Sequence, residues 1–539
     1  MSEPDPPAIE EMPAPLQIEP TRIPWLGLVG VLLGTCISTL NTRFSSFGLA
    51  DIRGALHAGI DEGAWITTSL TVGQMLIAPV AIWVGGVYGA RRPLIAAASA
   101  LAVISLVEPF ASNLHTLLAL QFLSGLASGF FVPLTLSFVL RNTPPKVWAY
   151  GIAIYALNLE VSLNVSASLE AWYLDHLSWA WMFWQNVPLA VAMALCLKFG
   201  TPPDPENPER PPTDFFGLAS GGTGLALIYA ALDQGNRLDW SNSGLIWGLA
   251  SAGVVLLIAF FVHESRTAHP GVNLKVVFAP PLPRLLLLIT FLRVTILSTA
   301  YAIPQFLQVV RGFRTIEVGQ TLVWIAMPQL LVCFTAGYLL RRIDPRLVAS
   351  IGFMCICCAC LMVAHGLTPT WGADQFLPSS LLQSVGQSFA LSAVVFFGVL
   401  HIRPEDRLTF GAAMQNARLM GGEIGSAFIA TLIRVRGQVA SNHLGLHVQI
   451  GDERAIHRIQ TYAAATARVG DPASGAARGA AMLGSVVHRM AVTQGIIDSF
   501  IVIAALTAIT LIVLVTRRAA PTGPASHVSP FARAETAPP

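Results

Sequence analysis

The chain has 539 residues, of which 54% are hydrophobic and only 12% are charged. A soluble protein would carry about 25% charged residues, so this composition excludes a typical soluble enzyme. The formal net charge of +2 provides no strong basic field, and no nucleic-acid partner is expected.

The apolar residues form repeated runs of about 20, the length at which an α-helix crosses a bilayer. The runs are continuous rather than alternating, which favours helices over transmembrane strands. We therefore predict an all-α integral membrane protein. Its fourteen expected spans lie near residues 25–48, 64–86, 93–112, 115–140, 149–172, 183–200, 214–232, 243–263, 284–306, 317–340, 347–366, 376–400, 410–433 and 494–516.

The polar linker 201–213 (TPPDPENPERPPT) divides the chain into parts. Six spans precede it in 25–200, two additional spans follow in 214–263, and the last six occupy 284–516. With the N-terminus inside, more than half of the 32 Lys and Arg residues lie in cytoplasmic segments. This asymmetry predicts that both termini are cytoplasmic.

Three segments outside the spans are polar or rich in Pro, Ala or Gly. Residues 1–24 and 517–539 are expected to be disordered cytoplasmic tails. Residues 434–493 are interpreted as a long periplasmic loop with some amphipathic helix. Metal binding by the scattered histidines of that loop is a less favoured interpretation. No metal site and no cofactor is predicted.

Charged side chains inside predicted spans are costly unless they have partners or face water. They fall in the first and fifth spans of each six-span half, which favours a shared polar cavity, although ion pairs that only lock helices together are the alternative. These residues are Arg43, Glu160, Glu170, Arg293, Arg418 and Glu423. The amides Asn41, Asn164 and Gln305 complete the candidates for substrate binding or proton coupling, and Glu160 shares a helix face with Asn164. In contrast, Glu108 near an outer span end is expected to anchor among lipid head groups.

Two loops provide a weak internal repeat. Residues 89–94 (GARRPL) follow the second span, and residues 341–347 (RRIDPRL) follow the tenth. If spans seven and eight are an insertion, these loops occupy equivalent places in two halves, as is typical of transporters. Gly89, Arg91 and Arg92 are therefore the predicted conformational-switch loop.

Four segments resemble the fourteen-span drug:proton antiporters of the major facilitator superfamily, the EmrB/QacA-like group. They are 62–69 (EGAWITTS), 179–188 (WAWMFWQNVP), 232–240 (LDQGNRLDW) and 415–425 (QNARLMGGEIG). The resemblance implies two six-helix bundles plus two extra helices, alternating access, and efflux across the inner membrane. It also implies a periplasmic membrane-fusion adaptor and an outer-membrane channel as candidate partners.

The chain departs from the family pattern where proton coupling is concerned. Asn41 stands where the pattern has Asp, Gln121 stands where it has Arg, and 166–171 (SASLEA) replaces the Gly-Pro antiporter motif. Because of these changes, the sequence does not predict that this chain uses the family's usual proton-coupling arrangement. Arg43, Glu160 and Glu170 are candidates to replace it.

The first functional hypothesis is a proton-coupled exporter of amphipathic or anionic small molecules in the inner membrane. Arg43, Arg293 and Arg418 would hold an anionic group, and Glu160, with Glu423 second, would exchange the proton. One alternative is an organic-anion importer or exchanger without proton antiport. Another is a membrane sensor or scaffold that transports nothing. An enzyme is not predicted, because the sequence has neither a nucleotide-binding signature nor a catalytic motif.

Overall fold

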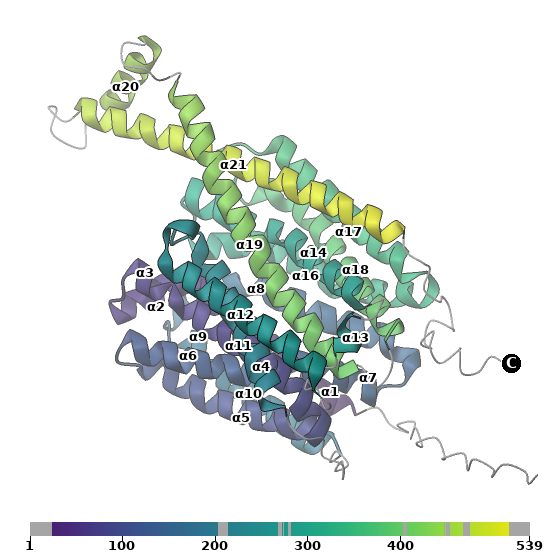
Figure 1. The fold of residues 1–539 in the computed structure, drawn as a ribbon. Helices are drawn as coiled ribbons and strands as arrows, with labels where there is room; N and C mark the ends of the chain where they lie inside the picture. Colours follow the sequence, from purple (N-terminus) through teal and green to yellow (C-terminus); the bar gives the residue numbers. More distant parts are fainter. Residues whose placement is uncertain are drawn as a thin grey trace, which may run out of the picture.

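The computed structural model describes residues 24–202, 214–267, 272, 274–278, 282–402, 407–446, 448, 453–466 and 475–516. Over these residues the chain is helical, without strands, as the continuous apolar runs predict. Long helices run side by side through the body of the molecule (Figure 1). The predicted tails and the linker 201–213 lie outside the described residues, except Pro24, Thr201 and Pro202.

Helices of the first part of the chain account for the first six predicted spans. They are α1 (Trp25–Phe47), α2 (Leu49–Leu56), α3 (Ile60–Gly63), α4 (Trp65–Tyr88), α5 (Arg91–Val107), α6 (Leu114–Ser128), α7 (Phe131–Asn142), α8 (Trp148–His176), α9 (Trp181–Trp184) and α10 (Asn186–Gly200). Short 3-10 turns cover Glu108–Phe110 and Pro145–Val147.

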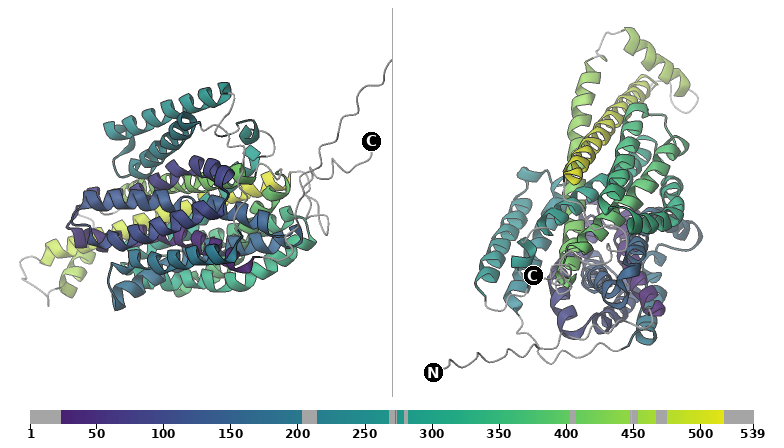
Figure 2. Two further views of the ribbon diagram at one scale, coloured as in Figure 1. Left: turned by 90° about the horizontal axis from the view of Figure 1, so that it is seen from below. Right: turned by 90° about the vertical axis from the view of Figure 1, so that its right-hand side faces the viewer.

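The two additional helices are α11 (Phe215–Gly235) and α12 (Gly244–Arg266), with a 3-10 turn at Trp240–Asn242 between them. The short helix α13 (Leu274–Phe278) follows. Helix α11 packs on α12, α4 and α19 (Arg407–Gly445). The pair α11–α12 lies at one side of the other helices, as both views of Figure 2 show.

The remaining helices belong to the last part of the chain. Together with α19 they are α14 (Leu282–Leu297), α15 (Ile303–Gln305), α16 (Thr315–Arg342), α17 (Pro345–Gly366), α18 (Leu377–Leu400), α20 (Glu453–Thr466) and α21 (Gly475–Val515), with a 3-10 turn at Asp374–Phe376. Two π-helical turns, Ser298–Ala302 and Phe306–Val310, flank α15. Pro304 lies between them and lacks a backbone N–H, which favours irregular helix here.

Within the described residues, thirteen helical segments are long and apolar enough to cross a membrane. The predicted span without a counterpart among these thirteen is 410–433, the thirteenth in chain order. It lies within α19, whose polar and charged residues, among them Arg418 and Glu423, lower its hydropathy. Helix α19 nevertheless packs lengthwise against α21 and α14 (Figure 1). The all-α membrane fold is confirmed, whereas the boundaries of the two bundles remain a prediction.

The structure adds detail to two of the sequence expectations. The span predicted at 115–140 lies within the membrane-length segment Leu114–Asn142, in which residues 129–130 form a turn between α6 and α7. The ring of Pro133 would clash with the carbonyl of residue 129 in a continuous helix. The described residues of 434–493 are largely helical, beyond the limited amphipathic helix expected there, since the many alanines of this segment favour helix. The end of α19, α20 and the start of α21 form an extension that projects beyond the other helices (Figures 1 and 2).

The two parts of the chain meet most closely along α8 and α16. A Cβ atom added at Gly319 of α16 would lie 2.6 Å from Oγ and 2.7 Å from Cα of Ser168 on α8. Small residues let membrane helices approach this closely, where dispersion contacts stabilise them. This contact fixes α8, the helix that carries Glu160 and Glu170, against the second part of the chain.

Candidate functional site

Glu160 is buried in the middle of α8, with 1% of its side chain exposed. Its Oε1 lies 3.9 Å from Nη1 of Arg293, which extends from α14. Neither carboxylate oxygen has a hydrogen-bond partner within the described part of the chain. The contact is therefore a loose ion pair, and a buried carboxylate held only in this way is free to change its partner or its proton.

Two further arginines complete the surroundings of this pair. The Nη2 of Arg43 on α1 donates to the carbonyl oxygen of Ala300 at 3.2 Å, within the first π-helical turn. The Nε of Arg418 on α19 donates to Oε1 of Gln415 at 3.0 Å. Arg43 and Arg418 both interact electrostatically with Arg293, and Arg418 also interacts with Glu160. The structure thus brings together four predicted residues from four helices.

Glu170 extends this charged cluster by ten residues along α8. It is fully buried, and it interacts electrostatically with Arg43 and with Asp51. Within the spans, three arginines face two glutamates, a formal excess of one positive charge when both glutamates are ionised; exposed Asp51 on α2 lies outside this count. An arrangement of this kind can accept an anionic group, because the excess charge offsets part of the cost of taking the anion from water.

Amides next to the cluster link the two parts of the chain. The Nδ2 of Asn164 donates to Oε1 of Gln387 at 3.3 Å, and Nε2 of Gln329 donates to the same oxygen at 3.2 Å. The Nε2 of Gln387 donates to Oγ1 of Thr299 at 2.7 Å. This network joins α8, α16 and α18 to the π-helical turn. Gln329 was not among the predicted residues, although an amide next to Pro328 in an apolar span is a detectable signal.

Two predicted amides lie apart from the charged cluster. Asn41 donates through Nδ2 to Oγ of Ser124 at 3.0 Å and accepts from Nδ2 of Asn186 at 3.2 Å, which joins α1 to α6 and α10. It does not face Arg43, because residues two apart lie on different sides of a helix. Gln305 on α15 makes no side-chain hydrogen bond to the part of the chain that the structure describes.

Glu108 is a buried acid and not a head-group anchor as expected. It is 0% exposed, and its Oε1 accepts a hydrogen bond from Nε2 of Gln121 at 3.1 Å. The hydroxyls of Ser105 and Ser124 are further partners of the carboxyl group. Sequence position alone suggested an interface, whereas α6 and α9 pack against the turn that carries the residue.

Glu423 belongs to a second acidic cluster, away from Glu160. Its carboxylate is a hydrogen-bond partner of Tyr229 and an electrostatic neighbour of Asp233, both on α11. Asp233 accepts hydrogen bonds from Oγ1 of Thr68 and, at 3.1 Å, from Nε2 of Gln234. Arg418 and Glu423 are five residues apart, so they point to different sides of α19. Two neighbouring carboxylates thus lie where the additional helix α11 meets α4 and α19.

The predicted switch loop contains a turn that requires glycine and an arginine that caps a helix. Gly89 has φ 73° and ψ 179°, a conformation that residues with a Cβ rarely adopt. Arg91 donates from Nε to the carbonyl of Leu197 at 3.2 Å and from Nη2 to that of Lys198 at 2.8 Å. It therefore caps the last turn of α10, where carbonyls lack helical partners. Arg92 lies exposed beside it.

The last turn of α16, where the second segment of the weak repeat begins, makes a different contact. The guanidinium of Arg341 lies 5.6 Å from the ring centroid of Tyr150, near the start of α8. This cation–π contact joins the second part of the chain to the first. The hydrogen bonds from Arg91 to Leu197 and Lys198, in contrast, lie within the first part.

Comparison with known proteins is consistent with this geometry. Residues 31–426 match the family described as Major Facilitator Superfamily. The probable multidrug resistance protein EmrY of Escherichia coli (strain K12) is 25% identical over 426 residues, which cover 76% of this chain and 80% of that protein. The fatty acid resistance protein FarB of Neisseria gonorrhoeae is 22% identical over 424 residues, which cover 77% and 82%.

Solved structures show the same fold. The human organic anion transporter MFSD10 (TETRAN) superimposes with a TM-score of 0.55 and 14% identity, covering 93% of this chain and all of that one. At such low identity the likeness concerns the fold alone.

Proposed function

This chain belongs to the Major Facilitator Superfamily and is a secondary transporter of the drug-efflux type, and from that premise we propose that it couples the export of amphipathic or anionic small molecules to proton movement. The observation that carries the proposal is the loose pair between Glu160 and Arg293, buried between two further arginines. Glu160 is the proposed proton carrier. The names of EmrY and FarB support amphipathic and fatty-acid-like substrates.

Alternating access supplies the transport step in this proposal. Bundles at 25–200 and 284–516 rock about the cluster, and a site that faced one side of the inner membrane then faces the other. The hydrogen bond from Arg43 to Ala300 and the bonds from Asn164 to Gln329 and Gln387 run from one bundle to the other. These bonds must break or rearrange as the bundles move. Their polar partners allow this because arginine and amide groups can rebond to substrate or water.

The charge of the substrate decides how it couples to the proton. A neutral or cationic amphipathic molecule that contacts ionised Glu160 competes with the proton, which gives exchange of one for the other. An anion held by Arg293 and Arg418 competes instead with the carboxylate, so anion binding and protonation of Glu160 favour each other. That second sign of coupling is cotransport.

Organic-anion import or exchange is therefore the second candidate function, and the excess of arginine over glutamate in the cluster favours it. Its signature is a substrate affinity that rises as the pH falls. Export by proton exchange has the opposite signature. Binding of a neutral dye and of an anionic dye to the purified protein across a pH series separates the two.

The helical extension is the proposed contact for a periplasmic membrane-fusion adaptor, and through it for an outer-membrane channel. The distribution of Lys and Arg predicts that the membrane face opposite the extension is cytoplasmic and that both termini lie there. The extension projects past the other helices, where it is accessible to a partner (Figure 1). Site-specific cross-linking from exposed Arg458 of α20 to a co-expressed adaptor tests this. Cross-links that form only from the opposite face would contradict it.

The central test of the proposed function is flux in proteoliposomes under an imposed pH gradient. Wild-type protein is expected to move a fluorescent amphipathic substrate faster when the gradient is present. Flux that is saturable but indifferent to the gradient and to a protonophore would reject proton coupling. Absence of saturable flux would favour a sensor or scaffold.

A further inference from the structure

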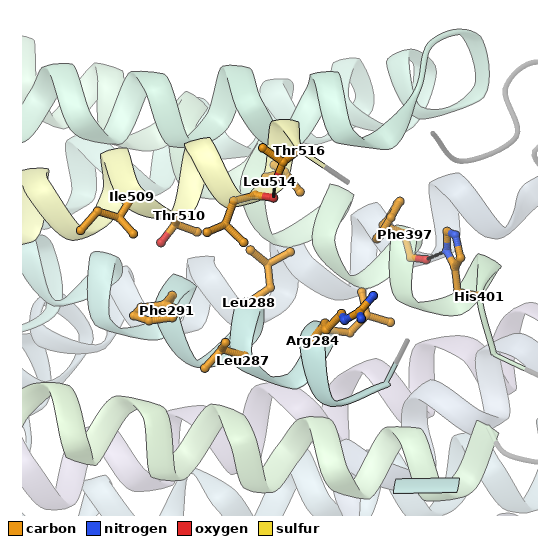
Figure 3. A pocket seen from close by; sticks show the side chains of 12 residues that line it. Arg284, Leu287, Leu288, Phe291, Phe397, His401, Ile509, Thr510, Leu514 and Thr516 are labelled. Carbon is orange, nitrogen blue, oxygen red and sulfur yellow. Dashed lines mark hydrogen bonds between the residues drawn. The ribbon is translucent and has the colours of Figure 1, made fainter. Parts of the chain in front are cut away.

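A cavity of about 430 Å³ lies between α14, α18 and α21, apart from the Arg–Glu cluster (Figure 3). Its volume falls within the range of small-molecule sites, roughly 300–1,000 Å³. Buried Leu288, Leu514 and Phe397 line its inner wall, while exposed Leu287 and Val513 line its outer edge. The side chains that surround it are mostly apolar, so an alkyl chain fits its interior.

Polar groups gather at one end of this cavity. Figure 3 shows Arg284 and His401 together there, with Ile509 and Phe291 at the other end. Arg284 lies in the first turn of α14, and His401 directly follows the last residue of α18. Thr516 directly follows α21 at the same end. All three belong to the membrane face that the distribution of Lys and Arg predicts to be cytoplasmic.

Both side chains, the guanidinium of Arg284 and the imidazole of His401, can reach a ligand. Arg284 is exposed and makes no hydrogen bond or ion pair to any residue that the structure describes. The Nδ1 of His401 donates to the carbonyl oxygen of Phe397 at 2.8 Å, which leaves Nε2 for a ligand. A guanidinium and an imidazole beside an apolar cavity match an anionic head on an alkyl chain.

We propose that this cavity binds a single-chain anionic amphiphile such as a fatty-acid carboxylate. The head group contacts Arg284 and His401, and the chain follows α14 toward Phe291. Those two residues of α14 are seven apart, which at 1.5 Å per residue gives a length of about 10 Å. The volume of about 430 Å³ between three helices suits one chain better than the two chains of a phospholipid. Binding here does not depend on the proposed proton coupling, because no residue of the Arg–Glu cluster lines the cavity.

Photolabelling tests the site without any transport assay. Purified protein in phosphatidylcholine nanodiscs is exposed to a palmitate that carries a photoactivatable diazirine, and labelled peptides are mapped by mass spectrometry. Labels are expected on α14 and α21 beside the cavity. Laurate is expected to compete, whereas dodecanol, which has the same chain length but no charge, is not.

Substitutions then separate the head-group contact from the chain contact. Removing both head-group contacts in Arg284→Gln/His401→Gln is expected to lower labelling by about tenfold, as for a lost charge-assisted contact. Arg266→Gln is the matched control, since Arg266 is an exposed arginine at the corresponding end of α12. Val513→Trp adds bulk at the exposed edge and is expected to reduce labelling with Arg284 and His401 intact.

Three results would overturn the proposal. They are undiminished labelling of the double variant, equal competition by dodecanol and laurate, or labels spread evenly over the lipid-facing helices. Competition by phosphatidylglycerol but not by laurate would overturn the single-chain assignment. Thermal unfolding of each variant shows whether a loss of labelling reflects a loss of fold.

Discussion

The Nη1 of Arg293 lies 3.9 Å from Oε1 of Glu160, yet Glu160 accepts no hydrogen bond from any residue that the structure describes. Arg293 and Glu160 come from α14 and α8, so the pair spans the two parts of the chain. A hydrogen-bonded pair would hold these helices in one arrangement. A loose pair with Arg418 close by can exchange partners during transport.

Removing the cation of this pair should be more damaging than removing both charges. Arg293→Gln leaves Glu160 buried with weaker compensation, and the expected loss of stability is about 3 kcal/mol, the low end for a broken buried pair, because Arg418 still attracts the carboxylate. The double variant Glu160→Gln/Arg293→Gln should recover most of this loss. Thermal unfolding in detergent measures both. Equal losses in the single and double variants would show that the pair makes no energetic contribution.

The amide network should be sensitive at Gln387, which bonds Asn164, Gln329 and Thr299. Gln387→Leu leaves buried amide groups without partners and is expected to cost about 1–3 kcal/mol. Gln308→Leu is the control, because Gln308 is exposed and its side chain makes no hydrogen bond to the described residues. Unfolding temperatures should separate the two variants. A Gln387→Leu protein as stable as the control would show that the network is not coupled to stability.

Gly319 should not tolerate a side chain. Gly319→Ala places a Cβ within 2.7 Å of Cα of Ser168, so α8 and α16 must separate, with an expected cost of about 1–3 kcal/mol. Gly248→Ala on α12 meets no atom within 4 Å and should leave stability unchanged or slightly raised. Thermal unfolding and substrate flux of both variants check this. Normal flux and stability in Gly319→Ala would mean that the close contact is not needed.

Removing one charge from the pair formed by Glu423 of α19 and Asp233 of α11 should not destabilise the protein. Glu423→Gln keeps a polar group for Tyr229 but removes the repulsion from Asp233, so its stability is expected to equal or exceed that of the wild type. Glu423→Leu removes the hydrogen bond as well and should be less stable than Glu423→Gln. The reverse order of unfolding temperatures would contradict a repulsive pair.

Much of the fold could be predicted because long apolar runs in the sequence indicate membrane helices. The charged residues Arg43, Glu160, Arg293 and Arg418 could be grouped for a related reason, since burying charge in an apolar span requires partners. The same reasoning failed for Asn41, which is close to Arg43 in sequence but lies on a different side of α1. The roles of the charged residues in transport stay predictions.

Other parts of the site depend on packing that the sequence does not display. Glu108 looked interfacial because it ends a span, but neighbouring helices cover it completely. Asp233 lay in a segment typical of the family, yet its closeness to Glu423 arises only when α11 packs against α19. The turn before Pro133 follows from the chemistry of proline, whereas the continuous apolar run around it shows no boundary between α6 and α7.

The most direct measurement compares wild type, Glu160→Gln and Glu62→Gln in proteoliposomes, with and without an imposed pH gradient. Glu62 is an exposed carboxylate in the short helix α3, before α4, and serves as the control. The gradient is expected to accelerate flux about tenfold or more in wild type and Glu62→Gln, since a pH difference of one unit supplies about 1.4 kcal/mol. Glu160→Gln should bind substrate but show no acceleration. Undiminished gradient-driven flux in Glu160→Gln would contradict the role of Glu160 as the proton carrier.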